Sequence, residues 1–129
     1  MPILNVKIGA LESRELTARI REMLLELTSR ILGKKPEVTA IAIDYIKPEH
    51  WSVAGVPLSD LGATSFYFDI KITDETNTKS EKEQYIREAF AGFERLLGRL
   101  HEVSYVHVHD VRAASYGYAG LTQEYRYHH

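Results

Sequence analysis

The residue in this sequence best suited to chemistry is Pro2, which stands directly before a predicted strand. Residues 3–8 alternate in polarity with a period of two, as a half-buried strand does. Proline is tolerated at a strand's first position because it has no amide proton to give the sheet. If Met1 is removed, the Pro2 nitrogen becomes a secondary amine whose pKa lies near the α-amino value of about 7.7–8.0 and falls on burial. A rigid amine of near-neutral pKa is suited to act as a general base.

A second interpretation of Pro2 involves no chemistry. With Met1 retained, the nitrogen of Pro2 is a tertiary amide and is neither a base nor a nucleophile. A proline after the initiator methionine is also a short motif with a high false-positive rate. The catalytic interpretation therefore depends on the removal of Met1, which the sequence leaves open.

The composition excludes several classes of protein. The chain has 129 residues, the size of one domain, and a formal charge of −2, so no basic field favours nucleic acid or membrane surfaces. It has no cysteine, which excludes disulfides and thiolate chemistry. No apolar run is long enough to span a bilayer, and no signal-peptide pattern precedes the first strand. We expect a cytoplasmic protein with no cofactor.

The periodicity of apolar residues predicts four main strands and two helices. A helix is expected over 13–32, with Gly33 in a left-handed conformation at its end, and a second helix follows a capping box of Ser80 and Glu83. The remaining predictions are strands at 38–46, 66–72 and 103–109, a loop or hairpin at 47–64, and short extended pieces in the tail that include Tyr125-Arg126-Tyr127.

The two halves of the chain are copies of each other. Residues 30–43 match residues 95–108 at a constant offset of 65, with identical Arg, Leu, Gly, Glu and Val positions. The sequence therefore predicts one α/β domain (α+β in some schemes) over 1–129, made of two βαβ repeats at about 1–63 and 64–129. Right-handed crossovers would place both helices on one face of a four-stranded mixed sheet. The other face would be bare and apolar, which predicts a homo-oligomer built on it.

An N-terminal proline on a first strand, followed by a duplicated βαβ unit, resembles the tautomerase superfamily over essentially the whole chain. The first half is similar to 4-oxalocrotonate tautomerase. The double-length form resembles macrophage migration inhibitory factor, its phenylpyruvate tautomerase relatives and malonate semialdehyde decarboxylase. The resemblance implies a homotrimer with active sites near subunit boundaries, around Pro2.

The resemblance also implies roles for individual residues beside Pro2. Lys34, in Gly33-Lys34, matches a lysine that lies next to the catalytic proline in the inhibitory-factor branch. Tyr105 matches a tyrosine of that branch's active site, and His107 stands where the branch has asparagine. Each has a structural alternative, such as a solvated lysine after a helix or a packed aromatic ring. The pattern thus predicts Lys34 and Tyr105 as catalytic partners and His107 as a substrate-binding residue.

Two aromatic residues and one arginine complete the predicted substrate-binding set. Trp51 falls near an active-site phenylalanine of the short tautomerase, although a loop tryptophan more often covers a core edge. Tyr118 corresponds to an aromatic residue at the pocket mouth of the inhibitory-factor branch. The short form holds a dicarboxylate with two arginines, whose aligned positions here are Leu11 or Glu12 and Ala40. Arg14 can substitute for the first of them, and no residue substitutes for the second. His107 and His109 share a strand face, but no third ligand accompanies them, so no metal site is predicted.

Three functions are compatible with these residues. The first is a keto–enol tautomerase for a small α-keto acid or enol, with uncharged Pro2 as the base and no nucleic-acid or membrane partner. The second is a decarboxylase or hydratase in which Pro2 is cationic. The third is a trimeric binding protein that has the fold without the activity.

Overall fold

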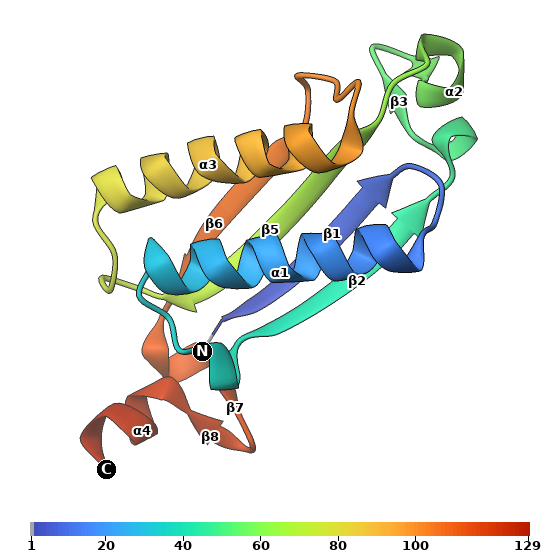
Figure 1. Ribbon diagram of the computed structural model, residues 1–129. Helices are drawn as coiled ribbons and strands as arrows, with labels where there is room; N and C mark the ends of the chain where they lie inside the picture. The colour runs from blue at the N-terminus through green and yellow to red at the C-terminus, as the bar shows by residue number, and fades with distance from the viewer. Residues whose placement is uncertain (1) are drawn as a thin grey trace.

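A four-stranded mixed sheet with two long helices against one face forms the body of the molecule (Figure 1). The computed structural model describes residues 2–129; Met1, whose removal decides the chemistry of Pro2, lies outside the described residues. The main strands are β1 (Ile3–Gly9), β2 (Ala40–Ile46), β5 (Ser65–Thr73) and β6 (Tyr105–Val111). The helices are α1 (Arg14–Arg30) and α3 (Lys79–Leu97).

The order of the strands is β2-β1-β5-β6, and it confirms the predicted tandem βαβ fold. Within each repeat the strands are parallel, β1 with β2 and β5 with β6. The repeats join through the antiparallel pair of β1 and β5, which places Ile3 opposite Lys71 and Gly9 opposite Ser65. The start of β1 therefore lies beside the end of β5.

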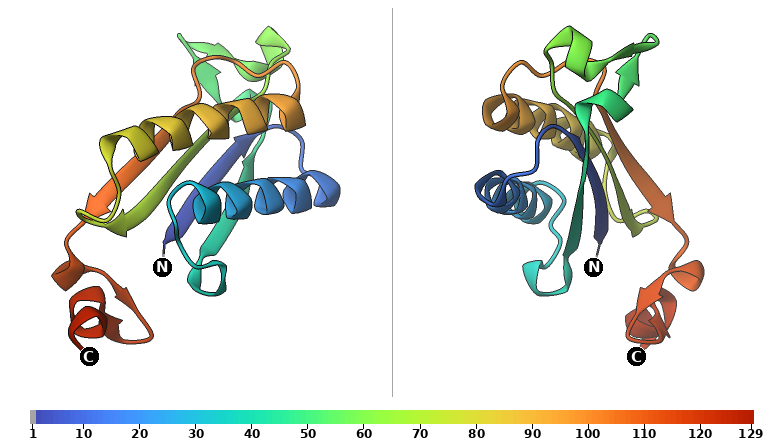
Figure 2. Two further views of the ribbon diagram at one scale, coloured as in Figure 1. Left: turned by 60° about the vertical axis from the view of Figure 1, so that its left-hand side comes forward. Right: turned by 90° about the vertical axis from the view of Figure 1, so that its right-hand side faces the viewer.

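The duplication extends further along the chain than the sequence match indicated. After β2 come η2 (Pro48–His50), β3 (Ser52–Val53), β4 (Val56–Pro57) and α2 (Leu58–Leu61). After β6 come η3 (Ala113–Ser115), β7 (Gly117–Tyr118), β8 (Leu121–Thr122) and α4 (Gln123–His128). Every one of these elements starts 65 residues after its counterpart. Figure 2 shows the two hairpin–helix units at opposite ends of the sheet.

Several predicted boundaries are corrected by the structure. Tyr125-Arg126-Tyr127 is helical, because the Thr122 side chain accepts a hydrogen bond from the Tyr125 amide and caps α4. The capping box of α3 is formed by Thr78 and Glu81, not by Ser80 and Glu83.

Two strands also start later than predicted. β2 begins at residue 40 because Pro36–Val38 forms a 3₁₀ turn, η1. β6 begins at residue 105 because Ser104 bonds the His101 carbonyl in a turn before the strand. The left-handed conformation predicted for Gly33 is confirmed, with φ of 69°.

The core lies between the sheet and the two helices. Alternate residues of β1 and β5 face the helices and are buried, as the period of two requires: Leu4, Val6, Ile8, Phe66, Phe68, Ile70 and Ile72. The rings of Phe66 and Phe93 stack with their centroids 4.0 Å apart, which fixes α3 on the sheet. Between the helices, the buried hydroxyls of Thr28 and Tyr85 share a hydrogen bond of 2.8 Å.

The other sheet face carries no helix, as predicted, but it is polar rather than apolar. Its central strand holds the row Tyr67, Asp69 and Lys71, in which Asp69 accepts from both neighbours. Next to this row the rings of His107 and His109 stack at 5.2 Å. Only the β2 edge presents small apolar side chains, Ala40 and Ala42. Over residues 2–129 no helix has the length and hydropathy needed to cross a bilayer.

Substitutions of Thr28 and Tyr85 should have non-additive effects on the free energy of unfolding. Tyr85→Phe leaves the Thr28 hydroxyl buried without its partner, and we expect the free energy of unfolding to fall by about 1–3 kcal/mol. Adding Thr28→Val removes the orphaned group, so the double variant should lose less than the sum of the single changes. Urea unfolding at equal protein concentration measures this, with the more exposed Tyr125→Phe as control. Strict additivity would contradict it.

Candidate active site

Pro2 lies buried at the start of β1, in a small recess of about 100 Å³. Its carbonyl accepts a hydrogen bond from the Ala40 amide at 3.0 Å, which continues the parallel β1–β2 pairing and fixes the residue. The rest of the recess is lined by residues from three segments: Ile3, Val38, Ala40, Tyr116, Gly117 and Tyr118. The proline ring is therefore rigid and desolvated.

The wall of this recess comes from the tail of the second repeat. Because β1 and β5 are antiparallel, the chain leaving β6 emerges near Pro2, and Gly117 and Tyr118 of β7 line the recess with it. The Tyr116 hydroxyl donates to the Lys71 carbonyl at 3.0 Å and anchors this segment to β5. Burial raises the pKa of Tyr116, and a hydrogen bond with the Ile3 backbone opposes that rise. Tyr116 is neutral and acts here as a structural wall.

A larger cavity of about 630 Å³ adjoins the recess, and Val38 and Tyr118 line both spaces. Three cationic side chains border the cavity, Lys34, Lys35 and Arg126, against one acidic residue, Glu37. Apolar, aromatic and uncharged polar residues complete the lining. This combination of an apolar body with a few convergent charges is typical of a site for a small anionic molecule.

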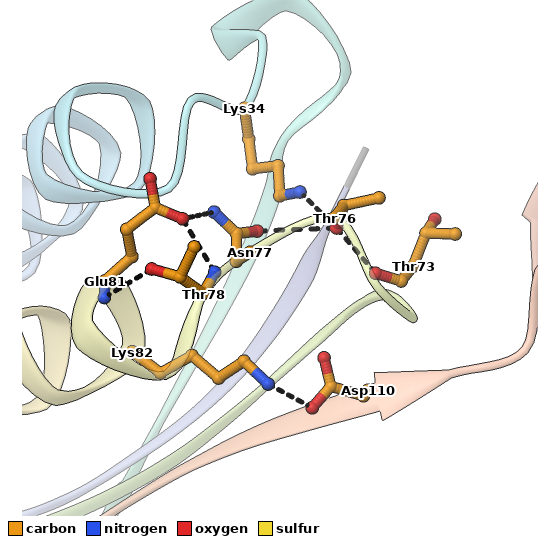
Figure 3. A network of polar contacts seen from close by, with 8 residues as sticks. All are labelled: Lys34, Thr73, Thr76, Asn77, Thr78, Glu81, Lys82 and Asp110. Carbon is orange, nitrogen blue, oxygen red and sulfur yellow. Dashed lines mark hydrogen bonds and ion pairs between the residues drawn. The ribbon is translucent and has the colours of Figure 1, made fainter.

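Lys34 is held in the cavity by the loop before α3 (Figure 3). Its Nζ donates to the Thr76 hydroxyl at 2.9 Å, and Thr76 in turn donates to the Thr73 carbonyl. Asn77 donates to the Leu32 carbonyl at 2.9 Å and so fixes the end of α1 just before Lys34. Two segments far apart in sequence thus place this ammonium group together.

The surroundings of Lys34 lower the pKa of its ammonium group. Burial lowers the pKa of Lys34, and the carboxylates of Glu81 and Asp110 oppose that shift without cancelling it. Asp110 is itself paired with Lys82 at 2.7 Å. Burial thus leaves Lys34 less strongly hydrated than a surface lysine.

The structure brings together only some of the predicted site residues within one chain. Lys34 and Tyr118 lie around the spaces that adjoin Pro2. Trp51 packs against Gly9 and Tyr105 begins β6, so both lie at the opposite end of the sheet.

The remaining two predicted residues are also distant from Pro2 within the chain. Arg14 is exposed on the first turn of α1, which follows the far end of β1. His107 faces outward from the middle of β6, beside His109. Among residues 2–129 no group of three or more potential metal ligands is found around this pair or elsewhere.

The second repeat does not supply an equivalent amine. Ile3 pairs with Ala40 and Tyr67 pairs with Tyr105, so Phe66 takes the position of Pro2. Phe66 is in the interior of the chain, and its amide nitrogen donates to the Ser104 hydroxyl. Only the first repeat can therefore present an amine at a strand start.

Sequence reasoning missed several residues of the site, among them Tyr116 and Arg126. The offset of 65 aligns Tyr116 with Trp51 and could have indicated it. In that segment, however, too few residues of the two repeats are identical for the match to be recognised. Nothing in the sequence singles out Arg126, because its place depends on how the tail sets α4 at the cavity that the α1–β2 loop also lines. Like Lys35, it is a cation of the cavity that the sequence analysis had not found.

Comparison with known proteins agrees with this architecture. The family model described as tautomerase enzyme matches residues 2–61. No curated protein matches the sequence. The solved structure of Pt0534 inactivated by 2-oxo-3-pentynoate is similar, with 14% identity, a TM-score of 0.83 and coverage of 96% of this chain and 98% of that one.

Two further solved structures have the same fold. The Q0 fused 4-OT, a symmetric trimer, has 16% identity and a TM-score of 0.77, with 95% and 96% of the two chains covered. A macrophage migration inhibitory factor-like protein from Entamoeba histolytica has 17% identity and a TM-score of 0.73, with 94% and 97% covered. The family model thus matches the first repeat, and the whole chain has the tautomerase-like fold of these solved structures.

The setting of Lys34 predicts its titration. We expect the Lys34 ammonium to lose its proton below the ordinary lysine pKa of 10.5, because burial disfavours the charged form. NMR titration of the lysine side-chain carbons measures the midpoint, and Lys34→Arg assigns the resonance by removing it. A midpoint at or above 10.5 would show that the side chain is solvated.

Proposed function

We propose that this protein is a keto–enol tautomerase for a small 2-oxo acid or its enol, with Pro2 as the general base after removal of Met1. The observation that carries the proposal is the position of Pro2, rigid and buried in a recess that adjoins a cationic cavity. The tautomerase family match over residues 2–61 supports this type of activity.

The proposed reaction needs one base and one group that stabilises negative charge. The uncharged Pro2 nitrogen takes a proton from the carbon next to the substrate carbonyl, and the carbonyl oxygen becomes an enolate oxygen. In this proposal Lys34, which borders the adjoining cavity, stabilises the developing charge. The proton then passes from Pro2 to the enolate oxygen, which gives the enol and regenerates the uncharged amine.

The cations around the recess favour a basic proline over a cationic one. Lys34, Lys35 and Arg126 border the adjoining cavity, and like charges disfavour protonation of a nearby amine. Burial of Pro2 acts in the same direction. This setting supports the tautomerase over the decarboxylase or hydratase mechanism, in which a charged proline is required.

The compared structures add support for the substrate class and the assembly. Pt0534 is inactivated by 2-oxo-3-pentynoate, which is itself a 2-oxo acid. The Q0 fused 4-OT is a symmetric trimer. We propose that this chain also forms a homotrimer through its bare sheet face. Residues remote from Pro2 within one chain, such as Tyr105 with 65% of its surface exposed, would then complete the site of a neighbouring subunit.

Replacing the rigid secondary amine should strongly lower the activity. We expect Pro2→Ala, which leaves a flexible primary amine at the N-terminus, to lower kcat/KM for ketonisation of enol-phenylpyruvate by about 100-fold or more, the usual contribution of a well-positioned general base. A lysine inserted between Met1 and Pro2 keeps the ring but makes the nitrogen an amide, and it should lose activity equally. The intact mass of each protein reports whether Met1 is absent.

The result that would contradict the base assignment is a fully active insertion variant with Met1 retained. An inactive wild type that has lost Met1 would instead favour the binding-protein interpretation. Circular dichroism of all three proteins checks that the fold is intact.

Sedimentation equilibrium tests the trimer. We expect wild type to sediment with three times the chain mass, and Ala42→Glu on the bare face to shift it toward the monomer, because an unpaired charge would be buried. Ser80→Glu adds the same charge on the exposed first turn of α3 and should leave the trimer intact. A trimeric Ala42→Glu protein would place the interface elsewhere.

A further inference from the structure

The side chain of Arg126, on α4, has a hydrogen-bond donor that the described residues do not satisfy. Its guanidinium carbon lies 3.8 Å from the centroid of the Tyr118 ring, and its Nη2 donates to the Tyr118 carbonyl at 3.1 Å. Its Nε is buried, with no hydrogen-bond partner among the described residues. The plane of the guanidinium is therefore fixed, while one of its donors is unused.

A buried N–H without a partner is uncommon in a folded protein and calls for a physical reason. Arg126 lines the cavity that also receives Lys34 and Lys35, against the single carboxylate of Glu37. A guanidinium presents parallel donors that match the two oxygens of a carboxylate. Because Nε is shielded from solvent, an anionic ligand in the cavity would bind at the outer nitrogens of the guanidinium, of which Nη2 already donates to the Tyr118 carbonyl.

The first repeat shows that the hairpin–helix unit does not need this arginine to fold. At the offset of 65, Arg126 corresponds to Leu61 and Tyr118 corresponds to Val53. The first unit forms the same hairpin and helix with these apolar residues. The arginine and the ring it stacks on are thus particular to the unit beside Pro2.

We propose that Arg126 binds the carboxylate of the substrate, and that the substrates are 2-oxo monocarboxylates with an apolar body. Tyr118 lines both the Pro2 recess and the larger cavity, so one molecule can present its reacting carbon to Pro2 and its carboxylate to Arg126. Val38 and Tyr127 give apolar walls for the remainder. Arg126 takes the role expected of Arg14, which lies at the other end of the sheet.

Binding of a carboxylate can be tested apart from catalysis, although the assignment of a substrate rests on the proposed function. The probes are phenylacetate and its neutral match, phenylacetamide, with Kd measured by NMR titration of the whole protein. We expect wild type to bind phenylacetate about 10–100-fold more tightly than the amide, the range for a hydrogen bond to a charged group. Arg126→Leu, which installs the first repeat's residue, should remove this preference.

Three comparisons make the test specific. Arg87→Leu, at an exposed arginine of α3, should keep the wild-type preference. Arg126→Lys keeps the charge but not the paired donors, and its preference should be intermediate. With enol-phenylpyruvate, Arg126→Leu should raise KM about 10-fold or more and change kcat by less than about threefold, because the lost contact is made in the ground state as well as in the transition state.

An Arg126→Leu protein that still prefers phenylacetate would overturn the inference, as would a wild type with no preference. Equal weakening of both probes would show a structural role and overturn it too. These outcomes are independent of the result for the lysine-insertion variant. If that variant is fully active with Met1 retained while Arg126→Leu loses the carboxylate preference, the carboxylate site stands and the tautomerase mechanism fails.

Discussion

The antiparallel pairing of β1 with β5 is the constraint on which the rest of the structure depends. It fuses two parallel βαβ units into one sheet and puts the start of β1 beside the end of β5. As a result, the segment that leaves the second repeat folds around the first residues of the first repeat. Pro2 is buried by the tail of the other repeat, and neither repeat alone forms the recess.

The two copies of the hairpin–helix unit have diverged into different roles. At one end of the sheet, Trp51 and Leu58 close on Gly9 so tightly that a Cβ there would lie 2.7 Å from Leu58. At the other end, the corresponding positions are Tyr116 and Gln123, and they border open space near Pro2. The same backbone therefore closes the core edge at one end and encloses a site at the other. This difference comes from side-chain size and polarity, because the paired elements keep a constant offset.

The charge around the recess is a second product of the duplication. Lys34 comes from the first repeat and its hydroxyl partner Thr76 from the second (Figure 3). Arg126 comes from the tail. Burial of Pro2 and the surrounding cations act on an amine in the same direction, toward the uncharged form. The same cations attract an anionic ligand. In the proposed mechanism, one arrangement therefore prepares the base and binds the substrate.

The sequence by itself determined the repeat, the strand and helix order and the side of the sheet that the helices cover. These follow from local periodicity and from the handedness of βαβ crossovers, which neighbouring residues encode. It also indicated Pro2, Lys34 and Tyr118, three residues that the structure brings around adjoining spaces. The tertiary structure alone decided that Trp51, Tyr105 and Arg14 lie far from Pro2 within the chain, and that Arg126 lies near the recess. Such placements depend on the antiparallel register and the fold of the tail, which no local pattern records.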